Sequence, residues 1–280
     1  MAVPLPLPIA RDARRSARKY LALFRTCLAE SVTYRTQNVV WVLVGTLPTL
    51  FAIIAWLAVY GARGQVDSYT RSDIITYNLV VALAWYVIGG RINNQIARGI
   101  KDGTLAQQLL KPYAALTYYI VGEQTWKIVS FLLALPVYVA LVVVFRHDLH
   151  LTPTLAQVAL TMVSTGCSAT LFIVIEVIIG LLAFWTTNTR NMFEVYDLLL
   201  LLASGELAPL ALFPSWAFGL LTVLPFRYTF SFPIEIFLGK LTPSGVATGF
   251  LWQVGWLIVL SLVARLMWTR GLRRYSATGM

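Results

Sequence analysis

The sequence predicts an all-α integral membrane protein with six transmembrane helices, and three observations support this. The 280 residues are 58% hydrophobic but only 12% charged, which is about half the charge of an ordinary soluble domain. The hydrophobic residues lie in long uncharged runs, several of them close to the roughly 20 residues that a helix needs to cross a bilayer. Lysine and arginine gather at the ends of these runs, as the positive-inside rule expects.

Six runs qualify as membrane-spanning helices. The fourth carries Glu176, and the fifth carries Asp197 and Glu206. The fourth is too long for one perpendicular helix, but no proline divides it, so we expect a single tilted helix. The expected spans cover residues 39–60, 74–90, 116–145, 155–187, 192–213 and 246–269.

The charge distribution places both termini in the cytoplasm. Most lysine and arginine residues precede the first span, separate the second from the third, or follow the last. Residues 1–37 are therefore a cytoplasmic tail, 38–270 the transmembrane domain and 271–280 a second cytoplasmic tail. Within the first tail, an amphipathic helix on the inner membrane surface is predicted from an apolar stripe at three- and four-residue steps. The stripe is Ala17, Leu21, Phe24, Leu28 and Val32.

The stretch before the last span differs from the others. Its apolar segments are too short to cross a bilayer, and prolines interrupt them. Aromatic residues here suit the boundary between headgroups and acyl chains. We expect two short re-entrant or interfacial helices on the outer side, covered by protein where their backbone is irregular. The prolines are Pro214, Pro225, Pro233 and Pro243.

The sequence motifs of common enzyme classes are missing. The only Gly-Lys pair, Gly239–Lys240, is followed by Leu241 rather than by Ser or Thr, so there is no phosphate-binding loop. Neither H-E-x-x-H nor G-x-S-x-G occurs. We expect no catalytic residue, metal or cofactor on this chain. The net charge of +10 is explained by membrane orientation and anionic lipid, so no nucleic-acid partner is expected.

The loop between the second and third spans is long and patterned. Gly103 should break the chain, Thr104 can cap a short helix over 105–110, and Pro112 helps to stop it. A short cytoplasmic helix with exposed apolar residues suits docking into the groove of a partner. The alternative is a helix that rests on the lipid surface.

Charged residues inside the spans cost about 2.5–3.5 kcal/mol or more at the bilayer centre. For Glu123 and Lys127, spaced i, i+4, the favoured interpretation is a pairing between helices, Lys127 with Glu123 or with Asp197. For Glu176 and Glu206, two interpretations stay open. They line a translocation path or relay protons, or they pair with groups on neighbouring helices.

Four segments in this order resemble the ABC type-2 permeases, in the branch of multidrug and antibiotic exporters. They are a basic amphipathic leader (RKYLALFRTCLAESVTYR), the loop GTLAQQLLKPY, the proline- and aromatic-rich outer segment, and a tail reading GLRRYSATG. The resemblance implies a half-transporter in the cell inner (plasma) membrane that pairs with a second permease, as homo- or heterodimer. It implies a connecting helix over 19–34 and outer helices over 214–240 that close the extracellular side.

The resemblance also implies a separate ATP-binding-cassette ATPase, which carries the ATP and Mg²⁺. This ATPase would dock on a coupling helix over 103–112. The function expected is export of an amphipathic small molecule or lipid-like substrate by alternating access. The alternative is a proton-coupled secondary transporter using Glu176 or Glu206, which predicts an internal repeat that does not stand out. The residues expected to dock the ATPase are Gly103, Thr104, Leu105, Gln108, Leu109, Leu110, Lys111 and Pro112.

Overall fold

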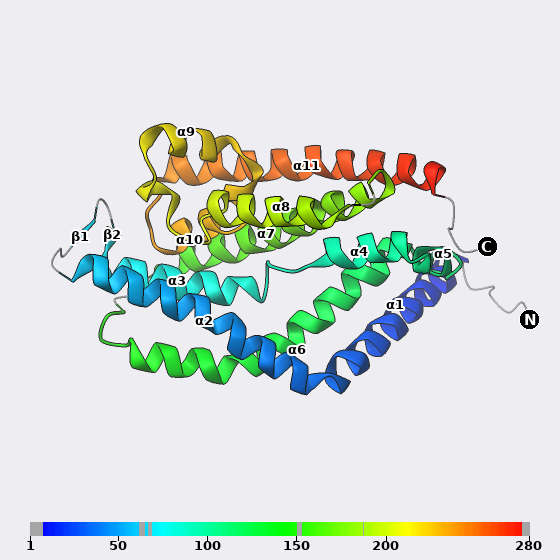
Figure 1. The fold of residues 1–280 in the computed structure, drawn as a ribbon, viewed down its shortest axis with the longest axis horizontal. Coiled ribbons are helices and arrows are strands. Elements are labelled where there is room, and N and C mark those ends of the chain that lie inside the picture. Colours follow the sequence, from blue (N-terminus) through cyan, green and yellow to red (C-terminus); the bar gives the residue numbers. More distant parts are fainter. Residues whose placement is uncertain (1–7, 62–64, 67–68, 150–152, 187, 276–280) are drawn as a thin grey trace, which may run out of the picture.

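The computed structural model describes residues 8–61, 65–66, 69–149, 153–186 and 188–275, so the ends of both predicted tails lie outside the described residues. The described chain is almost entirely helical, apart from a small antiparallel hairpin of β1 (Gln65–Val66) and β2 (Tyr69–Thr70). The helices run mainly along one axis, with α5 (Thr104–Leu109) at one end and the hairpin at the other (Figure 1).

Four described helices are long and apolar enough to cross a membrane. They are α2 (Arg35–Tyr60), α6 (Ala115–Val144), α7 (Leu155–Leu181), which a 3-10 turn extends to Phe184, and α11 (Pro243–Arg274). Their outward faces are rich in exposed leucine, valine and isoleucine, because lipid is the solvent there. This confirms a multi-pass, all-α membrane protein.

The other two expected spans are shorter helices. α3 (Arg71–Trp85) has 15 residues and α8 (Arg190–Ala203) has 14. At 1.5 Å per residue each covers about 20 Å, less than the roughly 30 Å of the hydrocarbon core. α3 is followed by a turn and then by α4 (Ile92–Lys101), further along the same axis (Figure 1). The number of six spans therefore stays a prediction.

The segment before α11 contains two short helices at the end opposite α5 (Figure 1). The first, α9 (Ser215–Val223), has no buried residue, and its Trp216 is largely exposed. The second, α10 (Ser231–Phe237), is buried against α3 and α7. Its Phe232, Ile234 and Ile236 belong to the largest hydrophobic cluster of the chain. Whether these helices re-enter the membrane stays a prediction.

Two buried or half-buried ion pairs fasten this outer cap, defined as residues 214–241. Arg227 and Glu235 lie 2.7 Å apart with side chains 12% and 4% exposed. The Ser231 hydroxyl donates to the same carboxylate at 2.6 Å. Lys240 reaches across to Asp73, at the start of α3, at 2.6 Å. One ion pair therefore stabilises the cap internally, and the other joins it to α3.

The first helix, α1 (Pro8–Thr33), packs along α6. The predicted apolar stripe is partly displaced. The buried residues of α1 are Leu23 and Cys27, while the predicted Phe24 and Leu28 are half-buried and Leu21 and Val32 are exposed. The side chain of Ala17 lies outside the described part of the helix. Tertiary packing on α6, which the helical periodicity alone does not reveal, selects a neighbouring face. The start of α1 and the end of α11 lie at the same end as α5 (Figure 1).

Candidate functional site: the α4–α5 hairpin and its buried supports

The short helix α5 is joined to α4 by a tight turn. Gly103 has φ +74°, a left-handed conformation that costs a residue with a Cβ about 1–2 kcal/mol. The helix begins at Thr104 and ends at Leu109, one residue earlier than predicted. Thr104 is not the cap, because the preceding glycine occupies that position without a side-chain bond. The Thr104 side chain instead hydrogen-bonds Tyr119 of α6.

One side of α5 is fixed to the bundle and the other side is open. Leu105 is completely buried and packs in a cluster with Ile96 and Ile100 of α4. Tyr113 donates a hydrogen bond to the Gln108 side chain at 3.0 Å, which closes the turn after the helix. On the open side Leu110 is 88% exposed, with Leu109, Lys111 and Pro112 also exposed beside it. The hairpin thus holds an apolar tip on a fixed base.

The start of α4 is held by two buried carboxylates. Glu123 of α6 accepts from the Arg91 N–H at 3.2 Å and from the Gln95 amide at 2.9 Å. Glu176 of α7 accepts from the Asn93 N–H at 3.1 Å. The first N–H groups of a helix lack partners within it, and negative charge at this end is favourable. The two carboxylates therefore cap α4 from neighbouring helices.

Lys127 has the complementary role at the end of α3. Its ammonium donates to the carbonyls of Ile88 at 3.1 Å and Val87 at 3.4 Å, in the turn that follows the last helical residue, Trp85. The predicted pairing of Lys127 with Asp197 is not formed among the described residues. Lys127 and Glu123 attract each other electrostatically but make no ion pair within 4 Å, because Lys127 is hydrogen-bonded to the turn and Glu123 to the start of α4. Asp197 instead pairs with Arg91, at 3.4 Å.

Glu176 and Glu206, for which the sequence left two interpretations open, occupy different sites. Glu176 is 2% exposed, and its backbone partner matches the second interpretation, contact with a neighbouring helix. Glu206 lies just after α8, half-buried, where the Trp85 side chain hydrogen-bonds it. Sequence reasoning did not recognise the capping roles of Glu123, Lys127 and Glu176. The adjacent Gly89 and Gly90 were the available signal, because paired glycines mark a break in a span.

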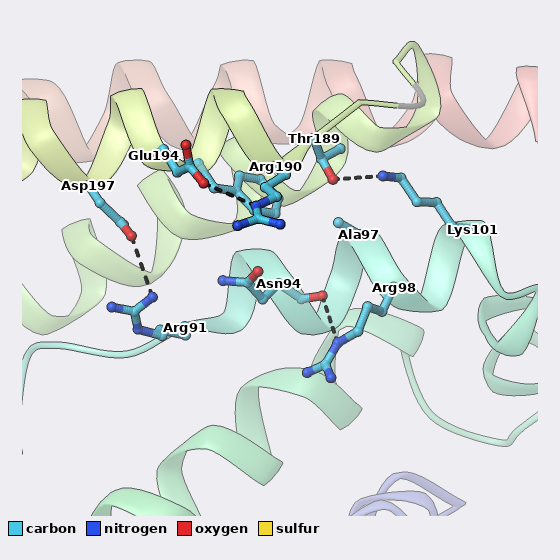
Figure 2. A pocket seen from close by; sticks show the side chains of 10 residues that line it. Arg91, Asn94, Ala97, Arg98, Lys101, Thr189, Arg190, Glu194 and Asp197 are labelled. Carbon is cyan, nitrogen blue, oxygen red and sulfur yellow. Dashed lines mark hydrogen bonds and ion pairs between the residues drawn. The ribbon is translucent and has the colours of Figure 1, made fainter. Parts of the chain in front are cut away.

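A small open pocket of about 250 Å³ lies between α4 and α8 (Figure 2). Its charged side chains contact one another or nearby polar groups, as Figure 2 shows: Arg190 pairs with Glu194 at 3.1 Å, and Lys101 donates to Thr189 at 2.7 Å. The exposed ion pair contributes at most about 1 kcal/mol. Around the pocket, α8 contacts α4 through these polar groups and through the buried Phe193, whereas buried carboxylates hold the start of α4.

Comparison with known proteins gives one family. Residues 46–279 match the model of a family described as ABC-2 family transporter protein. The matched range includes the α4–α5 hairpin, the buried charges and the outer cap, and leaves α1 outside. Among curated proteins, none matches the chain.

Proposed function

The chain belongs to the ABC-2 family of transporter proteins, and from this premise we propose that it is the membrane subunit of an ATP-driven exporter. A separate ATP-binding-cassette ATPase would bind ATP and Mg²⁺ and would dock on residues 103–112. A second permease, identical or different, would complete the translocation path. The substrate would be an amphipathic small molecule or a lipid, because the helices offer broad apolar faces and few fixed charges.

The observation that carries this proposal is the form of α5. Its exposed leucines, Leu109 and Leu110, project from a helix whose other side is fixed by Leu105. An apolar anchor on a rigid base suits docking in a hydrophobic groove, because little conformational entropy is lost on binding. The buried side of α5 would transmit a movement of the ATPase to the helices it contacts, and alternating access requires such a transmission.

The alternative, a proton-coupled transporter working through Glu176 or Glu206, gains no specific support. Glu176 accepts a hydrogen bond from the backbone of α4, and neither glutamate lines the pocket between α4 and α8. Transport by the chain without an ATPase distinguishes the two functions. If the ATPase drives export, the purified chain alone, in vesicles with an imposed pH gradient, should accumulate no substrate.

The docking test uses Leu109→Asp/Leu110→Asp. The tagged chain is purified in mild detergent, a co-purifying subunit with Walker motifs is identified by mass spectrometry, and ATP-driven transport is measured in membrane vesicles. Loss of buried anchors of this type weakens interfaces by about 2 kcal/mol or more, so binding should fall roughly thirtyfold. The control is Leu155→Asp, because Leu155 is 85% exposed and begins α7 at the opposite end. Undiminished, ATP-coupled transport in the double variant would refute the docking role.

A further inference from the structure

We infer that Glu123 and Glu176 are positioning residues that make the α4–α5 hairpin one rigid unit with α6 and α7. A displacement of α5 would then reach these two helices directly. The inference rests on the proposed function, since it says where the push delivered to α5 goes. The carboxylates themselves contact neither substrate nor nucleotide in this scheme.

The first argument is the position of the two carboxylates. Both are almost fully buried, and they come from two different helices. They bind N–H groups two residues apart, Arg91 and Asn93, at the start of α4. Together they fix α4 from two directions at the point where it leaves the turn after α3.

The second argument is the sign of the charges around this turn. Lys127, one helical turn along α6 from Glu123, donates to carbonyls of the turn between α3 and α4. The two carboxylates meet the start of α4, where the helix dipole favours negative charge. A neutral amide could accept the same N–H without the cost of a charge inside the membrane. The use of ionisable side chains on both sides of the turn indicates that the geometry of this break is strongly specified.

The third argument is the closeness of the backbones. A Cβ at Gly180 of α7 would lie 2.9 Å from the Asn93 carbonyl oxygen. A Cβ at Gly90 would lie 2.7 Å from the Glu123 carboxylate, and one at Gly99 would overlap the Tyr119 hydroxyl of α6. The contact at Gly180 is between backbones, whereas those at Gly90 and Gly99 are with side chains of α6. Glycine permits the close approach at each position, and at Gly180 no flexible side chain separates α7 from α4.

The fourth argument is the continuity from this junction to α5. Ile92, Ile96 and Ile100 of α4 share one buried cluster with Leu105 of α5 and with Val177 and Leu181 of α7. The α4 helix contacts α7 more extensively than it contacts any other helix. Phe193 of α8 also belongs to this cluster, and the polar contacts between α4 and α8 around the pocket are exposed or half-buried (Figure 2). The hairpin is therefore coupled to α7 most extensively, and to α8 through one buried phenylalanine and these polar contacts.

The first test requires no ATPase. Backbone hydrogen exchange is followed in residues 91–96 of the full chain in lipid nanodiscs, for Glu176→Leu, Glu176→Gln and the control Glu194→Gln. Losing the acceptor should raise exchange of this segment about tenfold or more, as expected for an unpaired buried N–H. Glu176→Gln retains an oxygen acceptor and should show a smaller increase, and Glu194→Gln should show none. Unchanged exchange in Glu176→Leu would overturn the inference.

Gly180→Ala provides the same test if Glu176→Leu does not fold. The added methyl group would displace α4 from α7 without removing a charge or a hydrogen-bonding group. Exchange in residues 91–96 should again increase while exchange in α11 stays unchanged. A variant with native exchange in residues 91–96 would show that the backbone contact does not hold α4.

The second test measures coupling in the complex with the ATPase. Glu176→Leu and Gly180→Ala should retain ATPase binding and ATP hydrolysis but move at least about fivefold less substrate per ATP. Restoration of this ratio in Glu176→Gln would exclude a merely structural defect. An unchanged ratio in all variants would overturn the inference even if exchange had changed. If no ATPase bound the native chain, the proposed function would fail, whereas the exchange result would stand alone.

Discussion

The ion pair Arg227–Glu235 in the outer cap provides the sharpest test of the fold. Both side chains are nearly buried, 2.7 Å apart, and the Ser231 hydroxyl donates to the same carboxylate. The Arg227 guanidinium also lies over the Phe218 ring, 5.5 Å from its centroid. The perturbation we propose is Arg227→Met, followed by Arg227→Met/Glu235→Met.

The expected magnitude follows from what each variant leaves behind. Arg227→Met leaves a buried carboxylate with one hydroxyl partner, which should cost about 3–5 kcal/mol. The double variant buries no charge. It loses the contact with Phe218, worth about 0.5–1 kcal/mol, and leaves the Ser231 hydroxyl without its acceptor, about 1 kcal/mol. It should therefore be more stable than the single variant by about 2 kcal/mol.

The assay is denaturant unfolding of the purified full chain in mild detergent, with free energies from linear extrapolation. Glu235→Met completes a double-mutant cycle, which isolates the energy of the pair. A double variant as unstable as Arg227→Met alone would refute the reasoning. It would mean that shape at the cap, rather than uncompensated charge, decides the stability.

Three further predictions concern single positions. Burial would raise the pKa of Asp73, but the hydrogen bond from Lys240 outweighs it and lowers the pKa. The ion pair thus stabilises the fold above the unfolded-state pKa of about 4, and this stabilisation is lost as pH falls through the lower folded-state pKa. Asp73→Asn should therefore flatten the decline of the melting temperature in acid. An unaltered decline would contradict the prediction. Leu105→Ala should destabilise the chain by about 2–5 kcal/mol in thermal unfolding, whereas Leu110→Ala should change stability by less than about 0.5 kcal/mol. Gly103→Ala should cost about 1–2 kcal/mol because of its positive φ, and a neutral result would exclude the left-handed turn.

Local signals in the sequence predicted much of this structure. The long apolar runs became α2, α6, α7 and α11, because the length of an apolar run can be compared directly with the thickness of a bilayer. The short helix after Gly103 was placed within one residue at each end, since glycine and proline interrupt helices locally. The same local pattern predicted exposed apolar residues on this helix, and Leu110 is exposed; its role in docking stays a prediction.

What the sequence did not predict depends on contacts between distant segments. The run 74–90 lacks charge and so resembled one span, yet α3 ends at Trp85 and the chain turns. This turn is held by Lys127 and Glu123, on another helix. The partner of Glu176 is 83 residues away, and no periodicity reports such a contact. Buried charges in a membrane segment indicate that partners exist, but the fold decides which partners they are.

The contacts between α3 and the last third of the chain have a consequence for biosynthesis. Tyr77 of α3 donates to the Gly205 carbonyl, 128 residues later in the chain, and Asp73 meets Lys240, 167 residues later. At ribosomal speeds of 5–20 residues per second, α3 emerges about 6 to 33 s before these partners exist. During that interval Tyr77 and Asp73 lack these two contacts. The N-terminal half therefore cannot complete its fold alone, and the insertion machinery or neighbouring lipids and water must shelter α3 until the last third of the chain arrives.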